Sequence, residues 1–540
     1  MAGDFDAPVI IVGAGPVGLA LAGDLGWRGI PSIVVEQTDG SIYQPRQDLV
    51  GIRTMEFCRR WGIVQDVIDC PYPRDYPQDN IYMAGPLVGG WEIGRYTNPP
   101  IGEDKPPPQS PQIRERCPQN MFDPILAKFA QSFDCVTMMY RHRYQSLQQN
   151  GEGVTIEVED LENGGVKTLR CRYLVACDGA NSKVRRDLGI TQTGNPALTY
   201  TTNVIFRCDG FEKIHGRPVG YRFIFIDEVG TWATIVAING RDEWRYSIIR
   251  SGDGSRDLTE DEVRANILKA VGTEFDYEIL SIMPWTRREL VADSYRSGDV
   301  FVCGDAAHAN SPTGGFGMNT GAGDSSDLCW KIAAVLDGWG GPKLLDSYHA
   351  ERQPVATRNV REASANLRRM LSPEPDPHRL DDTPDGAARR EKLGVDFARA
   401  MTNEWRTLGI HLGYVYENSP IIVPDGTPAP SLDPMIYEQT SRPGSRAPHV
   451  WLKDGRSTLD LFGRGFVLMR IGPDAPDPSA FENAAAAVGV PLEVVSIDEP
   501  DVVQAYERKL VLVRPDGHSA WRGDELPGEP QAVIDIARGA

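Results

Sequence analysis

The chain has 540 residues and a mass of 59.5 kDa, enough for about two to four structural units with a large core. It carries 56 Lys and Arg against 75 Asp and Glu, and this net charge of −19 argues against binding to nucleic acid or to an anionic membrane surface. Hydrophobic residues make up 41% and charged residues 24%, a globular composition that excludes the disordered, collagen-like and coiled-coil classes.

Targeting segments and thiol chemistry are not expected. The first residues, MAGDFDAPVI, contain no basic segment followed by a long apolar run, so we expect no signal peptide. No apolar run of about 18 residues occurs, so we expect no membrane-spanning helix. The nine cysteines form no CxxC pair, which argues against a metal site, a dithiol centre and a disulfide framework. These features predict a soluble cytoplasmic protein.

The opening residues predict a strand, a glycine-rich turn, a helix and a second strand. Residues 8–12 are apolar and β-branched, GAGPVG follows, and PSIVVE ends the second strand. In this context Gly13 permits a tight turn, Gly15 lets the backbone approach a pyrophosphate, and Gly18 lets the helix pack on the strand. Glu36 follows about 20 residues on, where a carboxylate binds a ribose. The pattern predicts a dinucleotide site without choosing between FAD and NAD.

The next elements change character along the chain. Helices are predicted from Thr54 to Trp61 and from Phe122 to Ser132, and a hairpin over residues 153–159 and 167–176. From Asn203 to Arg250, segments such as YRFIFID and TWATIVAI alternate in the way typical of an antiparallel sheet. This sheet is expected to have a role different from that of the nucleotide fold.

The later elements include a long helix and a separate C-terminal unit. The long helix is predicted from about Gly315 to Leu336. The Pro- and Asp-rich stretch SPEPDPHRLDDTPDG predicts a linker or surface excursion. Residues 440–540 alternate short strands with an Ala-rich helix, which predicts a small α/β domain.

Two polar elements follow predicted buried strands. They are ACDGANS at 176–182 and GDAAH at 304–308, the second followed by SPTGGFGMN and the long helix. Small residues and backbone amides at a helix start favour negative charge, and Asp305 is placed to bind a polyol chain. Either element alone is more typical of a turn, so their order and spacing carry the argument.

Together, the fingerprint near residue 13, the DG element near 178 and the GDAAH element near 304 resemble the group A FAD-dependent aromatic monooxygenases. These are the hydroxylases similar to p-hydroxybenzoate hydroxylase and phenol hydroxylase. The resemblance covers about residues 8–365, including LLDSYHAERQPVA at 344–356. The C-terminal unit resembles the thioredoxin-like domain of the long branch, as in 3-(3-hydroxyphenyl)propionate hydroxylase, but contains no cysteine.

The resemblance implies an α/β fold and a domain division. A Rossmann-like FAD-binding domain would comprise residues 1–200 and 285–370, with an antiparallel-sheet substrate domain inserted at 201–284. Residues 371–439 would form a linker and helical excursion, and 440–540 the thioredoxin-like domain without CxxC. A homodimer is also implied.

The resemblance further implies a set of FAD contacts. The glycine fingerprint would hold the pyrophosphate, Glu36 the adenosine ribose, and Pro312 to Asn319 the isoalloxazine edge. Asp178 belongs to an element that this family links to both FAD and NAD(P)H binding. The chain has no second GxGxxG in a strand–turn–helix context, which agrees with the family. The implied cofactor-binding residues are Gly13, Gly15, Gly18, Glu36, Arg46, Gln119, Asp178, Gly304, Asp305, Pro312, Gly317, Met318 and Asn319.

The implied reaction uses NADH or NADPH to reduce the flavin, after which O₂ forms a C4a-hydroperoxide that transfers one oxygen to a small phenolic or related aromatic substrate. Asp48 is the candidate phenol-activating base. Tyr221, Phe223 and Trp232 are candidate substrate contacts on predicted strands. The GDAAH histidine, His308, is interpreted as structural support for the flavin loop.

Other functions stay open. Within the same chemistry they are oxidation of a polycyclic polyketide and displacement of a ring nitro or halogen group. A non-catalytic flavin-binding sensor is the alternative outside enzymes. A flavin halogenase is disfavoured because no WxWxIP segment occurs, and a disulfide reductase because no Cys-x4-Cys pair occurs.

Overall fold

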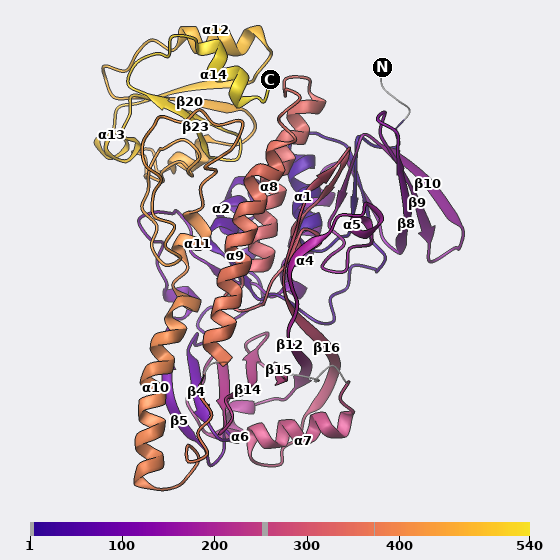
Figure 1. The fold of residues 1–540 in the computed structure, drawn as a ribbon, viewed down its shortest axis with the longest axis vertical. Helices are drawn as coiled ribbons and strands as arrows, with labels where there is room; N and C mark the ends of the chain where they lie inside the picture. Colours follow the sequence, from indigo (N-terminus) through magenta and orange to yellow (C-terminus); the bar gives the residue numbers. More distant parts are fainter. Residues whose placement is uncertain (1–4, 251–256, 372) are drawn as a thin grey trace.

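The computed structural model describes residues 5–250, 257–371 and 373–540. Residues 1–4 lie outside the described residues; they belong to the N-terminal stretch MAGDFDAPVI, for which no signal peptide is expected. Ser372 of the predicted linker also lies outside them. Figure 1 shows a nucleotide-binding part, an antiparallel sheet beneath it and a C-terminal part at the opposite end. The long helices α8 (Phe316–Leu336) and α9 (Ser347–Leu371) run between them.

The nucleotide-binding part is built on a six-stranded sheet whose central strands are parallel. Its strands, in spatial order, are β17 (Arg296–Ser297), β18 (Val300–Val302), β11 (Tyr173–Ala176), β1 (Val9–Val12), β2 (Ser32–Val35) and β7 (Val136–Met139). Because β1 is apolar and fully buried, it takes the centre of this sheet. Helices α1 and α4 pack against each other, and α1 also packs against α8.

Smaller elements complete this part of the molecule. The helices are α1 (Pro16–Trp27), α2 (Ile52–Trp61), α3 (Val64–Ile68), α4 (Gln119–Gln131) and α5 (Lys183–Asp187), with the short turns η1 (Ile101–Glu103) and η2 (Gly304–Ala306). The strands are β3 (Leu49–Val50), β6 (Glu115–Arg116), β8 (His142–Gln149), β9 (Val154–Asp160) and β10 (Val166–Cys171). The predicted helices at 54–61 and 122–132 and the long helix are confirmed, within three residues at their ends. The predicted hairpin is β9–β10, but its second strand ends at Cys171, and residues 173–176 form β11 of the six-stranded sheet instead.

The antiparallel part is an eight-stranded sheet that exceeds the predicted range 201–284. Its strands, in spatial order, are β19 (His308–Ala309), β16 (Glu278–Ala292), β12 (Gln192–Arg207), β15 (Glu243–Arg250), β14 (Thr231–Ala237), β13 (Arg222–Ile226), β4 (Asn80–Ala84) and β5 (Trp91–Tyr96). The hairpin β4–β5 comes from residues far earlier in the chain, and β13 pairs with β4 in parallel. Long-range pairing of this kind leaves no local sequence signal.

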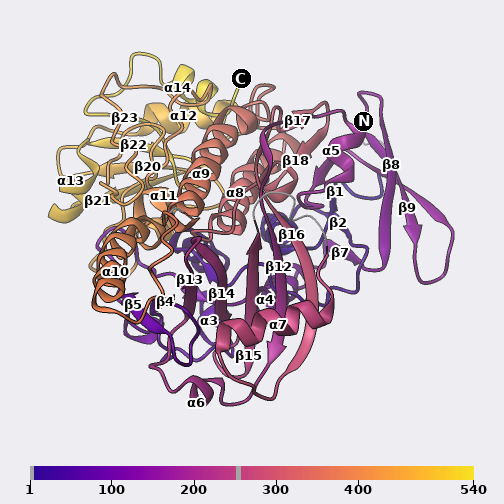
Figure 2. The same cartoon turned by 60° about the horizontal axis from the view of Figure 1, so that its bottom comes forward.

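The two faces of this sheet have different coverings. On one face, α7 (Glu260–Val271) and α6 (Phe211–His215) bury an aromatic core with Phe206, Phe223 and Trp244. Figure 2 shows α7 crossing in front of the strands. On the other face, α9 and α10 (Pro384–Trp405) pack beside Tyr82 and Ile224. A strand alternates its side chains between faces, so neighbouring residues of β13 serve different surroundings.

The C-terminal part has a four-stranded mixed sheet with helices against it. Its strands, in spatial order, are β21 (Leu492–Ile497), β20 (Phe466–Ile471), β22 (Leu510–Val513) and β23 (Ser519–Gly523). The other elements of this part are η3 (Thr458–Leu461), α12 (Ser479–Ala487), α13 (Pro500–Tyr506) and α14 (Pro530–Ala537). The short helix α11 (Leu408–Leu412) precedes this part and packs on α2. The small α/β domain predicted over 440–540 is therefore present.

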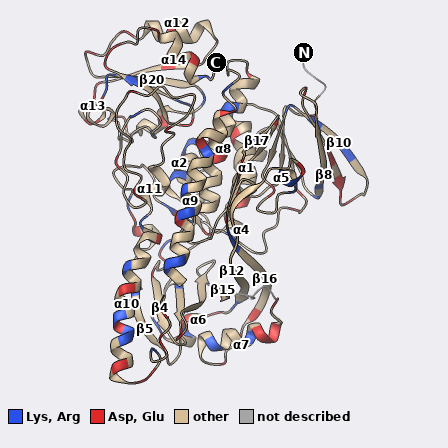
Figure 3. Ribbon diagram, viewed as in Figure 1, with Lys and Arg blue, Asp and Glu red and all other residues tan. Residues whose placement is uncertain are grey.

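The surface charge of the helices and their apolar length bear on what the protein can bind. Figure 3 shows acidic and basic residues interspersed along α10, whereas the acidic residues of α7 gather at its N-terminal end. Among the described helices, none combines the length and hydropathy that crossing a membrane requires.

Candidate active site

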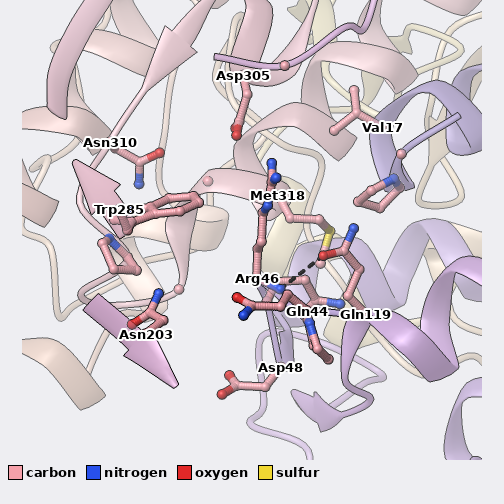
Figure 4. Close-up of a pocket in the computed structure, with 18 of the residues that line it drawn as sticks. Val17, Gln44, Arg46, Asp48, Gln119, Asn203, Trp285, Asp305, Asn310 and Met318 are labelled. Atoms are coloured by element: carbon pink, nitrogen blue, oxygen red, sulfur yellow. Dashed lines mark hydrogen bonds between the residues drawn. The ribbon is translucent and has the colours of Figure 1, made fainter. Parts of the chain in front are cut away.

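A cavity of about 580 Å³ lies where the two large sheets meet, and residues from both line it. The cofactor lobe includes Gly13, Gly15, Glu36, Arg46, Gln119, Asp178, Asp305, Pro312, Gly317 and Met318. The sheet lobe includes Asp48, Arg116, Thr201, Asn203, Tyr221, Arg222, Thr234, Val236, Arg245, Ser247, Met283, Trp285, Arg287, Met370, Glu404 and Trp405. In Figure 4, Arg46 stands between Asp305 and Asp48, with Trp285 on one side and Gln119 on the other.

The glycine turn has the shape that a dinucleotide requires. Gly13 has a φ of +106°, and a Cβ there would lie 2.4 Å from the carbonyl oxygen of Cys177. A Cβ on Gly15 would meet no atom within 4 Å, so its backbone is open to the cavity at the start of α1. Gly18 instead faces the protein, since a Cβ would lie 2.0 Å from the oxygen of Gly13. Gly18 therefore allows α1 to pack closely on the strand, and it does not line the cavity.

Carboxylates are fixed at the ends of three strands of the nucleotide-binding sheet. Glu36, after β2, accepts hydrogen bonds of 2.8 Å from the backbone N–H groups of Ala14 and Thr38. Asp178, after β11, accepts from the backbone N–H of Lys183 at 2.7 Å, while its buried Oδ1 has no partner among the described residues. Burial raises the pKa of Asp305, after β18, although His308 and Arg46 oppose the shift.

These groups fit FAD on the evidence of their own geometry. An open glycine backbone suits a pyrophosphate, and a buried acceptor without a partner, such as Asp178 Oδ1, suits hydroxyl or amide donors. The side chain of Gln119 adds a link, because its Oε1 accepts from the backbone N–H of Arg46 at 3.0 Å. Predicted residues from four separate stretches of the chain, near residues 13–46, 119, 178 and 305–318, thus line one lobe.

Asn319 and His308 support this lobe from behind. The Oδ1 of Asn319 accepts 2.7 Å hydrogen bonds from Gly51 N and Thr54 Oγ1. Its hydrogen-bonding capacity is therefore largely used within the protein, and neither it nor Gly304 lines the cavity. His308 contacts Asp324 at 2.9 Å and is 1% exposed, which agrees with the predicted structural role.

Two predicted substrate contacts, Phe223 and Trp232, do not lie in the cavity. Phe223 is buried in the aromatic core under α6 and α7, and Trp232 packs against that core near Phe225. Cavity residues such as Arg222 occupy the opposite sheet face. Period-two alternation identified the strand but not which face meets the cavity. Tyr221, which precedes β13, does line the cavity.

Asp48 lies in the sheet lobe within a hydrogen-bonded cluster. It accepts from the Tyr221 hydroxyl, from Arg116 Nη1 at 3.0 Å and from Arg245 Nη2 at 3.5 Å. Burial opposes the charge of Asp48, but these two arginines and the hydroxyl lower its pKa below the ordinary value. The Arg116 guanidinium also lies 3.6 Å from the ring centroid of Tyr221. Asp48 is therefore ionised at neutral pH.

Further charged residues in the sheet lobe were missed by sequence reasoning. Arg222 donates to both oxygens of Glu404, at 2.9 and 2.8 Å, from β13 to the end of α10. Arg287 of β16 lines the cavity and is 6% exposed. A signal was available, because an arginine within a half-buried strand is rare unless it has a partner or a ligand.

Gly13→Ala is expected to remove most bound FAD. The new Cβ would collide with the backbone at Cys177, and the positive φ adds strain, so flavin content should fall roughly tenfold or more. The measurement is the ratio of flavin to protein absorbance after purification. Gly29→Ala is the matched control, because Gly29 has a φ of +81° but no atom within 4 Å of its Cβ position. Equal flavin loss in both variants would contradict the prediction.

Comparison with known proteins also identifies an FAD-binding protein, and the matches extend over nearly the whole chain. A family model described as an FAD binding domain matches residues 6–363, and one described as aromatic-ring hydroxylase, C-terminal, matches residues 440–537. The 4-methyl-5-nitrocatechol 5-monooxygenase of a Burkholderia species is 33% identical, covering 99% of this chain and 97% of that protein. The tetracenomycin B2 monooxygenase-dioxygenase of Streptomyces olivaceus is 31% identical, covering 98% and 97%. The rebeccamycin biosynthetic enzyme RebC, solved with reduced flavin, is 38% identical with a TM-score of 0.91, covering 99% and 100%.

Proposed function

Because the chain belongs to the FAD-dependent aromatic-ring hydroxylases, we propose that it hydroxylates an extended aromatic compound at the junction of its two lobes. It is a flavin-dependent monooxygenase that consumes NAD(P)H and O₂. The observation that carries the proposal is the continuity of one cavity from the cofactor lobe into the sheet lobe. Ten of the lining residues of the sheet lobe come from β16, β12, β15, β14 and β13, which are five adjacent strands. At about 4.8 Å per strand they span roughly 19 Å, wider than a single ring needs.

The proposed FAD contacts come from the cofactor lobe. The backbone at Gly13 and Gly15 would hold the pyrophosphate, Glu36 the ribose, and Asp178 and Asp305 the polar groups between ribose and ring. The chemistry that FAD supplies when bound is electron transfer from NAD(P)H and activation of O₂ for oxygen transfer to the ring. The residues of the chain bind the cofactor, orient the substrate and exclude water.

In the sheet lobe, we assign Asp48 to positioning rather than to proton abstraction. A carboxylate with a lowered pKa is a weak base, and its oxygens already accept from Tyr221, Arg116 and Arg245. It fixes the hydroxyl of Tyr221 and the guanidinium of Arg116, both of which line the cavity. Those two groups would contact the ring and its hydroxyl.

The test of the function is NAD(P)H oxidation by the FAD-loaded protein over a panel of phenols and multi-ring hydroxyarenes. We expect one multi-ring class to accelerate NAD(P)H oxidation and to yield a product heavier by one oxygen atom. Uncoupled oxidation with no oxygenated product for any compound would contradict the proposal. Acceleration by simple phenols alone would contradict the extended-substrate part of it.

Asp48→Asn is expected to lower kcat/KM by roughly 10- to 100-fold, because Arg116 and Arg245 would lose their shared carboxylate. Steady-state kinetics with the best substrate of the panel measures the loss. Since the pKa of Asp48 lies below its ordinary value, its contribution should be constant above about pH 4 and disappear only under stronger acid. An Asp48→Asn variant with wild-type kinetics would contradict the assignment. So would a step near neutral pH in the kcat/KM profile of the wild type that is absent from Asp48→Asn.

We also propose a homodimer in the cytoplasm, supported by the resemblance to group A monooxygenases. Light scattering on the purified protein should give about twice the chain mass of 59.5 kDa. Cell fractionation should recover the activity with the cytoplasmic fraction.

A further inference from the structure

The sheet lobe holds more positive charge than its own carboxylates neutralise. Its charged lining residues are Arg116, Arg222, Arg245, Arg287, Asp48 and Glu404. Four arginines against two carboxylates leave a formal excess of two positive charges, inside a chain whose net charge is −19. The excess is therefore local to this lobe.

The excess centres on Arg287. Arg116 pairs with Asp48, and Arg222 makes two hydrogen bonds to Glu404. Arg287 is 6% exposed, and its Nε and Nη1 are buried without a hydrogen-bond partner among the described residues. Burial and the neighbouring charge of Arg222 lower its pKa to about 10, which still leaves it protonated at neutral pH. A buried cation without an acceptor is costly unless a ligand supplies one.

Other lining groups near Arg287 are hydrogen-bond donors as well. Trp285 lies two residues before Arg287 on β16, so both project from the same sheet face, and its Nε1 has no partner within the described chain. Thr201 of β12 is directly opposite Trp285 in the sheet register, and its Oγ1 is also buried without a partner. Figure 4 shows Trp285 at the edge of the pocket, on the same side as Asn203.

The rest of the lobe suits an aromatic ring rather than a free inorganic anion. Val236, Met283 and Met370 line it together with the ring of Trp285. A ligand that satisfies both features combines an apolar ring system with an acceptor-only, negatively charged group. A carboxylate matches the planar fork of an arginine and brings one charge.

We propose that the substrate is an aromatic carboxylic acid whose carboxylate is bound by Arg287, with the Thr201 hydroxyl and the Trp285 indole N–H as further donors. This inference rests on the proposed function, since it names the substrate class of the same cavity. Arg287 is then a specificity-determining residue. Arg222, held by Glu404, shapes the lobe beside it.

The test is ligand binding to the FAD-loaded protein without NAD(P)H, followed through the flavin absorption spectrum. The matched probes are 3-hydroxy-2-naphthoate and 2-naphthol, which differ only by the carboxylate. The wild-type protein should bind the acid at least roughly tenfold more tightly than the naphthol. In Arg287→Gln this preference should disappear while the affinity for 2-naphthol stays unchanged, and Arg287→Lys should retain part of it.

The matched control is Arg207→Gln on the exposed end of β12, which should keep the full preference. If Arg287→Gln loses its flavin, Thr201→Val provides a second test and should reduce the preference. Equal binding of acid and naphthol by the wild type, an undiminished preference in Arg287→Gln, or tighter binding of 2-naphthyl phosphate than of the acid would overturn the proposal.

Turnover is measured separately, so the two proposals fail in different ways. A preference for the acid that depends on Arg287, without any oxygenated product, would support the carboxylate site while contradicting the proposed function. Hydroxylation of 2-naphthol and of the acid with equal kcat/KM in wild type and Arg287→Gln would leave the function standing and overturn the carboxylate site.

Discussion

Arg514→Met should lower the free energy of unfolding by about 3–5 kcal/mol, because it removes one partner from a fully buried ion network. Arg514 follows β22 in the C-terminal part and is 0% exposed. Its guanidinium reaches Glu351 of α9, Asp327 of α8 at 3.2 Å, and Asp516 at 2.6 Å. Lys331 shares the first two of these carboxylates. Without Arg514, the network would contain more buried negative charge than its cations balance.

Chemical denaturation of the FAD-loaded protein measures this loss. Arg508→Met is the control, because the exposed Arg508 lies 3.6 Å from Asp524, and such surface pairs contribute less than about 1 kcal/mol. The double variant Arg514→Met/Glu351→Met should recover part of the stability, since it removes one of the carboxylates left unbalanced. An Arg514→Met variant as stable as Arg508→Met would contradict the prediction.

The same network gives a direction for acid unfolding. Burial alone would raise the pKa of Glu351, but Arg514 and Lys331 outweigh it and lower the pKa to about 2. A carboxylate with a depressed folded-state pKa contributes stability above its unfolded value, near 4.5, and loses it as the pH falls toward 2. The wild type should therefore lose stability over this window. In the double variant, which lacks both residues, that contribution should be absent.

Asp305→Asn should weaken FAD binding while leaving the apoprotein as stable as before or slightly more stable. A carboxylate that accepts from the cofactor contributes about 1.5–3 kcal/mol, so the dissociation constant should rise roughly 10- to 100-fold. In the apoprotein the same carboxylate lines the cavity, and burial raises its pKa, so its charge is a cost there. Opposite effects on binding and stability are the signature of a residue that serves the ligand.

Flavin fluorescence titration of apoprotein gives the dissociation constant, and thermal unfolding of apoprotein gives the stability. Asp337→Asn, at the C-terminal cap of α8, is the control and should change neither. A parallel loss of apoprotein stability in Asp305→Asn would mean that Asp305 supports the fold rather than the cofactor. An unchanged FAD dissociation constant would contradict its proposed role.

The sequence by itself determined the features that depend on local spacing. The glycine turn after β1 was predicted from a strand, three glycines and a helix within one short segment. In the structure Gly13 has the positive φ that such a tight turn requires. The long helix α8 was predicted because helical periodicity is a pattern of residues that are close in sequence. The FAD-binding family followed from three such elements in the right order.

Only the tertiary structure decided what the sheet lobe contains. Whether a β-strand residue faces the cavity or the core depends on which elements cover each face, so Arg222 lines the cavity while its neighbour Phe223 lies in the core. Arg222 pairs with Glu404, which is distant in sequence. Arg287 has two buried nitrogen atoms without a hydrogen-bond partner among the described residues, and this too depends on residues distant in sequence. The charge balance of a cavity depends on residues that folding brings together from distant parts of the chain. No short stretch of sequence contains all of these residues.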